Sequence, residues 1–222
     1  MENLSVIIPA WQAEKYITQA IQSVKCQKWN GEVEIIVCND GSTDRTEEMA
    51  RAQGVNVLGK EQGGAASARN MGLKAAKGAY IFFLDADDIS LENALECLYR
   101  PMQNNPEIMA VFGRAEDFIS EELTEQQKAA LKPRPESYGG VLPGCALIRK
   151  EVFGKIGLFD EGLKSGETVS WLLKLRESGI CTVTVEQTVL KRRLHLTNTG
   201  RLNPQEEMRN YAALLRERMR KK

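Results

Sequence analysis

Hydrophobic positions in the first hundred residues alternate between short aliphatic runs and amphipathic stretches. The runs are the length of buried strands in a sheet that is covered on both faces. They lie at Leu4–Ile8, which Pro9 should end, and at Val33–Cys38, Val55–Leu58 and Ala79–Leu84. The stretches between them carry apolar residues three and four positions apart, which indicates helices. This alternation predicts a parallel, doubly wound α/β sheet.

Three helices are expected between these strands. Ile17, Ala20, Ile21 and Val24 form one apolar face of the first helix. Asp44 is expected to cap the second, with Glu47 three residues on as its reciprocal partner. The third covers Ala65–Ala76, and Gly78 would follow it at the C′ position.

The second half of the chain is less regular. A polar, proline-terminated stretch, Glu121–Pro135, is interpreted as a mobile excursion. The other expected elements are helices at Leu91–Met102, Ser170–Glu177 and Pro204–Lys222, and strands at Ile108–Gly113, Val141–Ile148 and Thr182–Val185. The last helix ends in basic residues, which we interpret as a solvated face, with membrane contact as the alternative.

Composition narrows the class of protein. The 222 residues carry 42% hydrophobic side chains, enough to bury one sizeable core. Thirty basic residues balance thirty acidic ones, which argues against a dedicated nucleic-acid binder. Five scattered cysteines without a C-x-x-C pair fit reduced thiols. With no signal-peptide pattern and no long apolar run, the chain is expected to be cytoplasmic.

Polar residues collect at three of the first four strand ends. These are Pro9–Trp11, Asn39–Ser42 and Asp85–Asp88. Ligands of open parallel sheets bind at the carboxyl ends of the strands. Turn formation and helix capping are the alternative explanations, and they are weakest for the last group. Its clustered carboxylates repel one another unless a cation such as Mg²⁺ or Mn²⁺ offsets their charge.

Other nucleotide-site signatures are missing from the sequence. Pro9–Gln12 stands where a dinucleotide fingerprint would need its glycines, and neither a P-loop nor a kinase motif occurs. The single histidine, His195, has no nucleophile motif to make a catalytic triad with.

Five stretches, in order, resemble the family 2 glycosyltransferases of the GT-A fold. They are Ser5–Trp11 (SVIIPAW), Val37–Asp44 (VCNDGSTD), Gly63–Gly72 (GGAASARNMG), Phe83–Asp88 (FLDADD) and Gly157–Glu161 (GLFDE). The resemblance implies a Rossmann-like, mostly parallel sheet flanked by helices, in a single domain. Residues 1–100 would form the nucleotide-sugar half, 101–200 the acceptor half, and 201–222 a C-terminal helix.

The same resemblance implies inverting transfer from a UDP-type sugar nucleotide with a divalent metal, Mn²⁺ or Mg²⁺. Carried over by position, Pro9, Ala10 and Glu14 would line the nucleoside pocket. Asp40 would accept the imide N–H of the base, and Arg69 would lie near the nucleotide, with a helix-surface salt bridge as the alternative. Asp85 would face the ribose or the water shell of the metal. Asp87, in the D-x-D motif, would bind the metal directly.

Two assignments beyond the D-x-D motif follow from the C-terminal half. His195 would bind the metal or diphosphate, although a lone histidine is more often structural. Beside it, Arg192 and Arg193 offer guanidinium groups suited to phosphate, and Arg193 is assigned to the nucleotide-sugar. Trp171 would either form an acceptor wall or, more in keeping with its leucine-rich helix, belong to the core.

The general base is the point at which the sequence departs from the family. Members carry a Glu-Asp pair after the Phe-Asp-Glu motif, and the aspartate serves as the base. Here the pair reads Glu167-Thr168. Because threonine is no base near neutral pH, Glu167 is the predicted catalytic residue. Asp160 or Glu161 would serve if the alignment shifts, and loss of transfer activity is the third interpretation.

Three functions are therefore compared. The first is an active transferase acting on a glycan, a lipid-linked or a protein acceptor. The second is a nucleotide-sugar-binding protein that has lost its base. The third, a sugar nucleotidyltransferase, is disfavoured because Pro9–Glu14 is not the Gly-rich basic loop that it needs. The C-terminal amphipathic pattern would allow a homodimer or peripheral attachment at the inner face of the membrane.

Overall fold

The computed structural model describes residues 2–139, 142–163, 165–198 and 216. Its nine strands form one sheet in the order β3-β2-β1-β4-β8-β6-β9-β5, with β7 paired to β6. The strands are β1 (Leu4–Ala10), β2 (Val33–Asn39), β3 (Asn56–Gly59), β4 (Tyr80–Phe83), β5 (Ile89–Ser90), β6 (Ala110–Ile119), β7 (Tyr138–Gly139), β8 (Ala146–Arg149) and β9 (Thr182–Leu194). The first four are parallel, and β8 joins β4 and β6 in antiparallel pairing.

Helices cover both faces of this sheet, as the alternating pattern predicts. One face packs against α1 (Ile17–Lys25), α2 (Thr46–Ala52) and α4 (Ala94–Asn104). The other packs against α3 (Ala65–Ala75), α6 (Glu151–Ile156) and α7 (Glu167–Glu177). The four apolar residues predicted for the first helix are all buried. Because each central strand is covered on both sides, its side chains are apolar at nearly every position.

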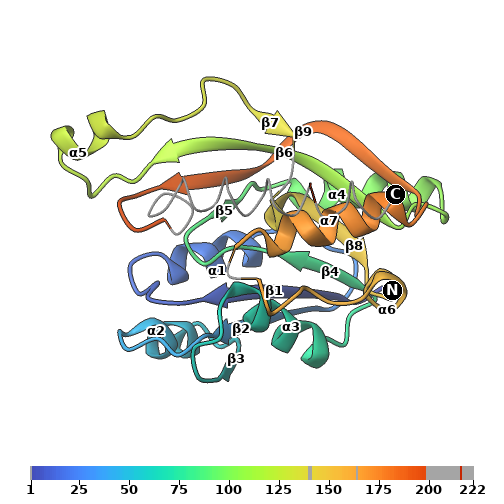
Figure 1. The fold of residues 1–222 in the computed structure, drawn as a ribbon, viewed down its shortest axis with the longest axis horizontal. Helices are drawn as coiled ribbons and strands as arrows, with labels where there is room; N and C mark the ends of the chain where they lie inside the picture. Colours follow the sequence, from blue (N-terminus) through green and yellow to red (C-terminus); the bar gives the residue numbers. More distant parts are fainter. Residues whose placement is uncertain (1, 140–141, 164, 199–215, 217–222) are drawn as a thin grey trace.

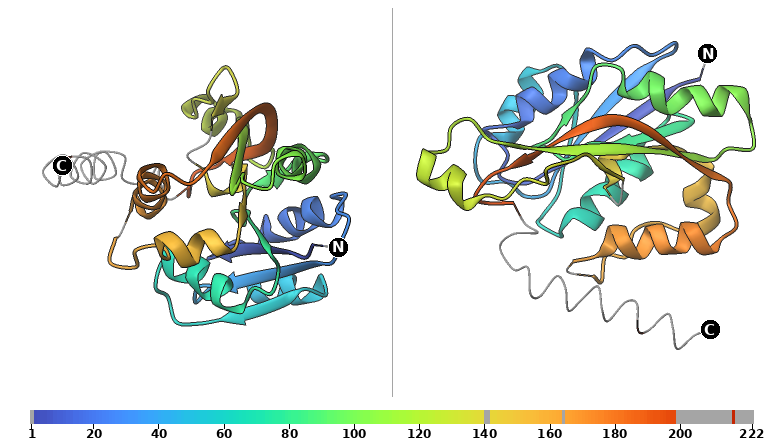
Figure 2. Two further views of the ribbon diagram at one scale, coloured as in Figure 1. Left: turned by 90° about the vertical axis from the view of Figure 1, so that its right-hand side faces the viewer. Right: turned by 90° about the horizontal axis from the view of Figure 1, so that it is seen from above.

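The second half of the chain is built on a long pair of strands. β6 and β9 run parallel and side by side across the molecule, and the short helix α5 (Glu125–Ala130) lies beyond the end of β6 (Figure 1, Figure 2). The expected strand Thr182–Val185 is thus only the start of β9, which continues to Leu194. Four of its thirteen residues are exposed and five are only partly buried, so its polar positions concealed the strand.

Several local predictions were wrong. β1 does not end before Pro9 but continues to Ala10. The last residue of β1 that pairs with β4 is Ile7, so the N–H that Pro9 lacks is not needed for pairing with that strand. The expected mobile excursion contains α5, which Thr124 and Gln127 hold with a capping box. The strand expected from Val141 starts at Ala146, after a 3₁₀ turn over Pro143–Cys145.

Two capping predictions were also wrong in detail. Asp44 does hold the start of α2, since its Oδ1 accepts from Thr46 N at 3.0 Å, but Glu47 bonds Asn39 and Arg51 instead of returning to the cap. Gly78 has no left-handed conformation. Glycine is required at this position because a Cβ on residue 78 would lie 2.5 Å from Ser5 N.

The structure also bears on the predictions for the cysteines, for membrane-spanning helices and for the C-terminal helix. The five cysteines are free thiols. Among the described helices, none has both the length and the apolar character that crossing a bilayer requires. The predicted helix at Pro204–Lys222 lies outside the described residues, apart from Arg216, and the division of the domain into three parts stays a prediction.

Gly72 sets the distance between α3 and the sheet. A Cβ there would lie 2.4 Å from Ile7 Cγ2 and 2.9 Å from Cys38 Sγ. Glycine is otherwise a poor helix residue, so its presence in α3 is explained by this close approach.

We expect Gly72→Ala to destabilise the protein by about 1–3 kcal/mol because the new methyl group overpacks the core. The matched control is Gly154→Ala in α6, where a Cβ meets nothing within 4 Å. The control should gain roughly 0.5–1 kcal/mol from helix propensity. Urea unfolding of both variants measures the difference, and equal stabilities would refute this explanation of Gly72.

Candidate active site

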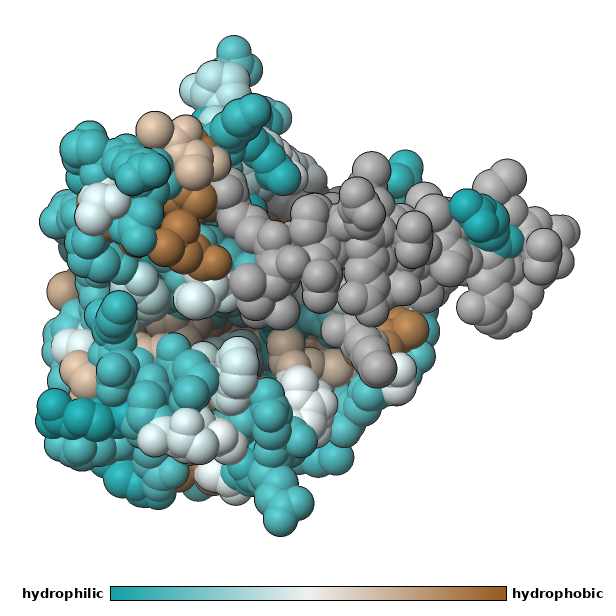
Figure 3. Space-filling view, turned by 60° about the vertical axis from the view of Figure 1, so that its left-hand side comes forward, coloured by the Kyte–Doolittle hydropathy of each residue, from teal (hydrophilic) through white to brown (hydrophobic). Residues whose placement is uncertain are grey.

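The polar strand ends meet at the point where the strand order reverses. From β1 the chain adds β2 and β3 on one side and then β4 on the other. Ala10 pairs with Asn39 and Ile7 pairs with Phe83, so the residues that follow these three strands lie at one edge. Figure 3 shows the surface hollowed between the two halves of the molecule, with hydrophobic side chains gathered above the hollow. This edge is the expected ligand position.

The loops after β1 and β2 are bound together. Gln12, in a left-handed conformation (φ 50°), donates its N–H to Ser42 Oγ at 3.0 Å. Glu14 Oε2 accepts from Arg45 N at 3.0 Å. Trp11 stands half exposed beside buried Ala10. Pro9, Ala10 and Glu14 thus belong to a fixed wall, and their contact with a nucleoside stays a prediction.

Asp40 is buried and is bound by the loop that follows β3. Its Oδ1 accepts from Lys60 Nζ at 2.5 Å and from Gly63 N at 2.9 Å, and its Oδ2 accepts from Gly64 N at 2.8 Å. The carboxylate therefore ties this loop, and with it the start of α3, to the end of β2.

Arg69 bridges two carboxylates across the site. One Nη donates to Asp85 Oδ1 at 2.9 Å and the other to Glu167 Oε1 at 2.8 Å. The arginine is buried, and its Nε has no hydrogen-bond partner within the described chain. Burial alone would lower the pKa of Arg69, but the charges of Asp85 and Glu167 raise it above its ordinary value. Arg69 is thus buried and not on the helix surface, and its predicted place near the nucleotide stays a prediction.

Asp87 and His195 approach each other at the opposite end of the Asp-rich segment. His195 Nε2 lies 2.8 Å from Asp87 Oδ2, and Nδ1 lies 2.9 Å from Thr197 Oγ1. Asn198 supports both residues, donating its amide to Asp87 Oδ2 at 3.2 Å and accepting from His195 N at 2.7 Å. The structure brings the two predicted metal ligands together, although they are 108 positions apart in sequence.

Arg193 lies behind this pair, with its guanidinium group in contact with protein. Its backbone N–H donates to Asp88 Oδ1 at 2.9 Å and its Nε to the Asp87 carbonyl at 2.8 Å. The guanidinium carbon lies 4.7 Å from the centre of the Tyr16 ring and 4.5 Å from that of Phe118. In this state Arg193 positions the Asp-rich segment, and its predicted contact with the sugar nucleotide stays a prediction.

The third carboxylate of the segment, Asp88, is buried. Burial, together with the charges of Asp87 and Asp85, raises the pKa of Asp88 well above its ordinary value. Protonation of Asp88 would lower the repulsion among the three carboxylates.

Tyr16 links the two halves of the molecule beside His195. Its ring lies 4.9 Å from the imidazole, and its hydroxyl donates to Glu122, which follows β6. Burial and this hydrogen bond raise the pKa of Tyr16 to about 12. Burial would raise the pKa of Glu122, but hydrogen bonds from Ser120 and Tyr16 outweigh it and lower the value to about 2. At neutral pH the pair is thus a phenol donating to a carboxylate.

The residues considered around the base have distinct positions. Glu167 opens α7 with its side chain mostly buried, and Thr168 Oγ1 lies 3.5 Å from Arg69 Nη1. Glu161 bonds Asn70 at 2.8 Å, which is the main reason that its pKa is lowered, and Asp160 accepts from Gly162 N in a turn. Trp171 is buried and stacks on Phe153 at 4.8 Å, so the core interpretation is correct.

Sequence reasoning missed Lys60, Tyr16 and Asn198. Lys60 directly follows β3, the one of the first four strands whose end was not counted among the polar strand ends. The charged residue after that strand was the signal that could have identified it. Asn198 lies three residues after His195, the spacing of a turn. Tyr16 had no sequence signal, because its partner Glu122 is 106 residues away.

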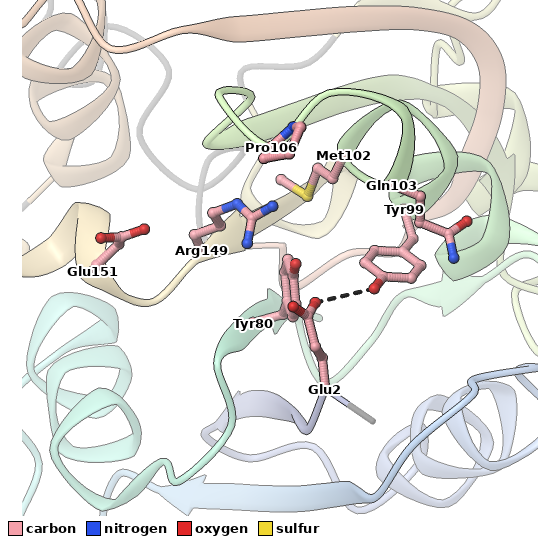
Figure 4. Close-up of a pocket in the computed structure, with 8 residues that line it drawn as sticks. All are labelled: Glu2, Tyr80, Tyr99, Met102, Gln103, Pro106, Arg149 and Glu151. Atoms are coloured by element: carbon pink, nitrogen blue, oxygen red, sulfur yellow. Dashed lines mark hydrogen bonds between the residues drawn. The ribbon is translucent and has the colours of Figure 1, made fainter.

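A separate cavity of about 460 Å³ lies at the other end of the sheet, by the start of β4 (Figure 4). Tyr80, Tyr99 and Arg149 line it, and Tyr99 donates its hydroxyl to Glu2 at 3.0 Å. It contains none of the predicted site residues, so it is distinct from the candidate active site.

Comparison with known proteins agrees with this geometry. The family model "Glycosyl transferase family 2" matches residues 5–157. The glycosyltransferase GlyG of Streptococcus pneumoniae is 33% identical over 179 residues, covering 70% of this chain and 59% of its own. An uncharacterised glycosyltransferase of Rickettsia prowazekii is 33% identical over 229 residues, covering 92% and 68%. The chain thus spans about three fifths to two thirds of these relatives.

Solved structures show the same fold. S. aureus TarS 1–349 in complex with UDP-GlcNAc superposes with a TM-score of 0.73 at 19% identity, over 96% of this chain and 65% of that one. GalNAc-T7 with UDP, GalNAc and Mn²⁺ gives 0.71 at 20% identity, over 97% and 48%. The predicted fold class is confirmed.

We expect Arg69→Met to destabilise the protein by about 3–5 kcal/mol, because it leaves two carboxylates facing each other without their cation. The loss of stability should be near the lower value, about 3 kcal/mol, because the side chain of Asp85 is 35% exposed and water screens its charge. Adding Asp85→Asn and Glu167→Gln to Arg69→Met should restore part of the loss. Chemical denaturation measures all three steps; a single variant within about 0.5 kcal/mol of wild type would contradict the bridge.

Proposed function

The chain belongs to glycosyl transferase family 2, and we propose that it is a metal-dependent, inverting enzyme that moves a sugar from a UDP-sugar to an acceptor hydroxyl. The observation that carries the proposal is one edge of the sheet that presents a buried acceptor, Asp40, a pair of side chains 2.8 Å apart, Asp87 and His195, and a carboxylate at the start of α7, Glu167. The likeness to complexes with UDP and UDP-GlcNAc supports this choice of donor.

The nucleoside would lie at the ends of β1 and β2. Asp40 would accept an N–H of the base, and the half-exposed face of Trp11 would pack against a planar ring. The diphosphate would extend from there toward Asp85 and Asp87, at the end of the neighbouring strand β4. This order follows the order of the strands in the sheet.

The residues at the end of β4 fit a divalent cation. Asp87 Oδ2 and His195 Nε2 lie 2.8 Å apart in a hydrogen bond, so both would be within reach of one ion that replaced the shared proton. Carboxylate oxygen suits Mn²⁺ and Mg²⁺ alike, and the imidazole nitrogen favours Mn²⁺. No group of three His, Cys, Asp or Glu in the described chain could hold an ion alone, so diphosphate oxygens would complete the site. The ion would stabilise charge on the departing diphosphate.

Glu167 would be the general base. Its Oε1 is held by Arg69, while Oε2 has no protein partner in the described part of the chain. The acceptor hydroxyl would pass its proton to this oxygen as its own oxygen bonds to the anomeric carbon. The bond from that carbon to the diphosphate breaks on the opposite face, and UDP leaves with the electron pair. Single displacement inverts the anomeric configuration.

The acceptor would enter beside α7 and the β6–α5 segment. A glycan, a lipid-linked sugar or a protein side chain would each supply the hydroxyl. The chain spans 59% of GlyG, so further parts of such a protein would also take part in choosing the acceptor. Action at the inner face of the membrane and pairing as a homodimer remain part of the proposal.

The donor site is tested by thermal shift with UDP and Mn²⁺. Wild type should be stabilised by roughly 3 kcal/mol at ligand concentrations about 100 times the dissociation constant. Asp87→Asn should lose the Mn²⁺-dependent part, because an amide replaces an anionic ligand. The matched control, Asp117→Asn on β6, should behave as wild type. No shift in wild type with any nucleoside diphosphate would overturn the donor site.

The base is tested by hydrolysis or transfer of UDP-sugars in Glu167→Gln. Loss of a general base typically lowers kcat by about 10²–10⁴-fold. UDP affinity should stay unchanged, since the amide still accepts from Arg69. Thr168→Asp, which restores the family residue, should keep or raise the rate. Unchanged turnover in Glu167→Gln would exclude this base, and UDP binding without turnover in wild type would favour the binding protein.

A further inference from the structure

The carboxylate of Asp40 is paired with a lysine at the neighbouring strand end. Lys60 directly follows β3, and its backbone N–H donates to Asn39 O at 3.2 Å. The side chain turns back so that Nζ lies 2.5 Å from Asp40 Oδ1. Asp40 is 6% exposed and Lys60 is 23% exposed. The pair is therefore a mostly buried anion with a cation at its open side.

Close packing holds this pair in place. A Cβ on Gly63 would lie 2.4 Å from Lys60 Nζ, and a Cβ on Gly41 would lie 2.8 Å from Gln62 N. Gly41 also has a left-handed conformation (φ 75°), which favours glycine. The loop 60–64 can close on Asp40 only because both positions lack side chains.

The hydrogen bonds of the Asp40–Lys60 pair leave one acceptor position and some donors that a ligand could use. Oδ1 already accepts two N–H groups, while Oδ2 accepts one, from Gly64, and keeps one acceptor position. An ammonium group has three N–H donors, and one of those on Lys60 points to Asp40. A ligand therefore meets one acceptor directly beside cationic donors.

We propose that Lys60 is a specificity-determining residue that, with Asp40, selects uracil. The ring N3–H of uracil would donate to Asp40 Oδ2, and the neighbouring carbonyl oxygen O4, which cytosine replaces with an amino group, would accept from Lys60 Nζ. This inference rests on the proposed function, since it requires the nucleoside to bind at the end of β2. It adds a second contact to the base edge and gives Lys60 a role beyond neutralising Asp40.

Cytosine is the informative competitor because it has the same ring size. At the ring position where uracil carries N–H, cytosine carries a lone pair, which would face the carboxylate. A buried acceptor left without a donor loses its hydrogen bonds to water and gains none. Cytosine also has an amino group in place of one carbonyl, so Lys60 would meet a donor there.

The test measures dissociation constants of UDP and CDP by calorimetry with Mn²⁺ present. Wild type should prefer UDP by about 100-fold, and Lys60→Met should weaken UDP binding by roughly 10- to 100-fold with little change for CDP. Lys60→Arg keeps cationic donors and should retain most of the preference. Lys155→Met, at an exposed lysine on α6, is the matched control and should leave both constants unchanged.

The outcomes separate the two proposals. A damaged loop would weaken UDP and CDP together, so a base-dependent loss is specific to recognition. If Lys60→Met binds UDP more weakly yet keeps the UDP preference, Lys60 is structural and the inference is overturned. An unchanged UDP constant overturns it as well. If wild type binds neither nucleotide, the proposed donor site itself fails.

Discussion

The candidate site depends on one buried cation. Arg69 has two carboxylate partners, and they come from different halves of the fold: Asp85 follows β4 and Glu167 begins α7. A guanidinium group donates in a fixed planar arrangement, so the spacing of the two carboxylates is fixed as well. Neither half can move without leaving a charge unpaired in a low-dielectric interior. Gly72, one turn further along α3, allows the helix that carries this arginine to lie close against the sheet.

The strands of the first half could be predicted because burial on both faces makes them continuously apolar. Ile7, Ile36 and Phe83 lie on one face and Val6 and Val37 on the other, and every one is fully buried. The second half resisted prediction for the opposite reason. β9 has one exposed face over much of its length, and α5 depends on a local capping box with no buried residue. The spacing of hydrophobic residues along a sequence reflects which side chains are buried. Helices and strands with few buried residues are therefore not detected from it.

The site residues could be found from the sequence, but their pairing could not. Charged groups at strand ends identify Asp40, Asp85 and Asp87, and the family motifs add Arg69 and Glu167. The contacts among these residues depend on how distant parts of the chain pack together. Arg69 and Glu167, for example, are 98 positions apart in sequence. For the same reason the sequence did not reveal that Arg69, placed near the nucleotide by the family resemblance, and Arg193, assigned to the sugar nucleotide, contact protein carboxylates, carbonyls and aromatic rings.

The position of His195 has a consequence for how the site is assembled. Asp87 and His195 are 108 positions apart in sequence, and β5, β6, β7, β8 and all of β9 lie between them. The residues proposed to hold the nucleoside, by contrast, lie within the first 64 residues of the sequence. As the chain leaves the ribosome, this part of the proposed site can form long before the last strand exists. The pair at the end of β4 forms only when β9 docks beside β6, so completion of the sheet and completion of the proposed metal end of the site are one event.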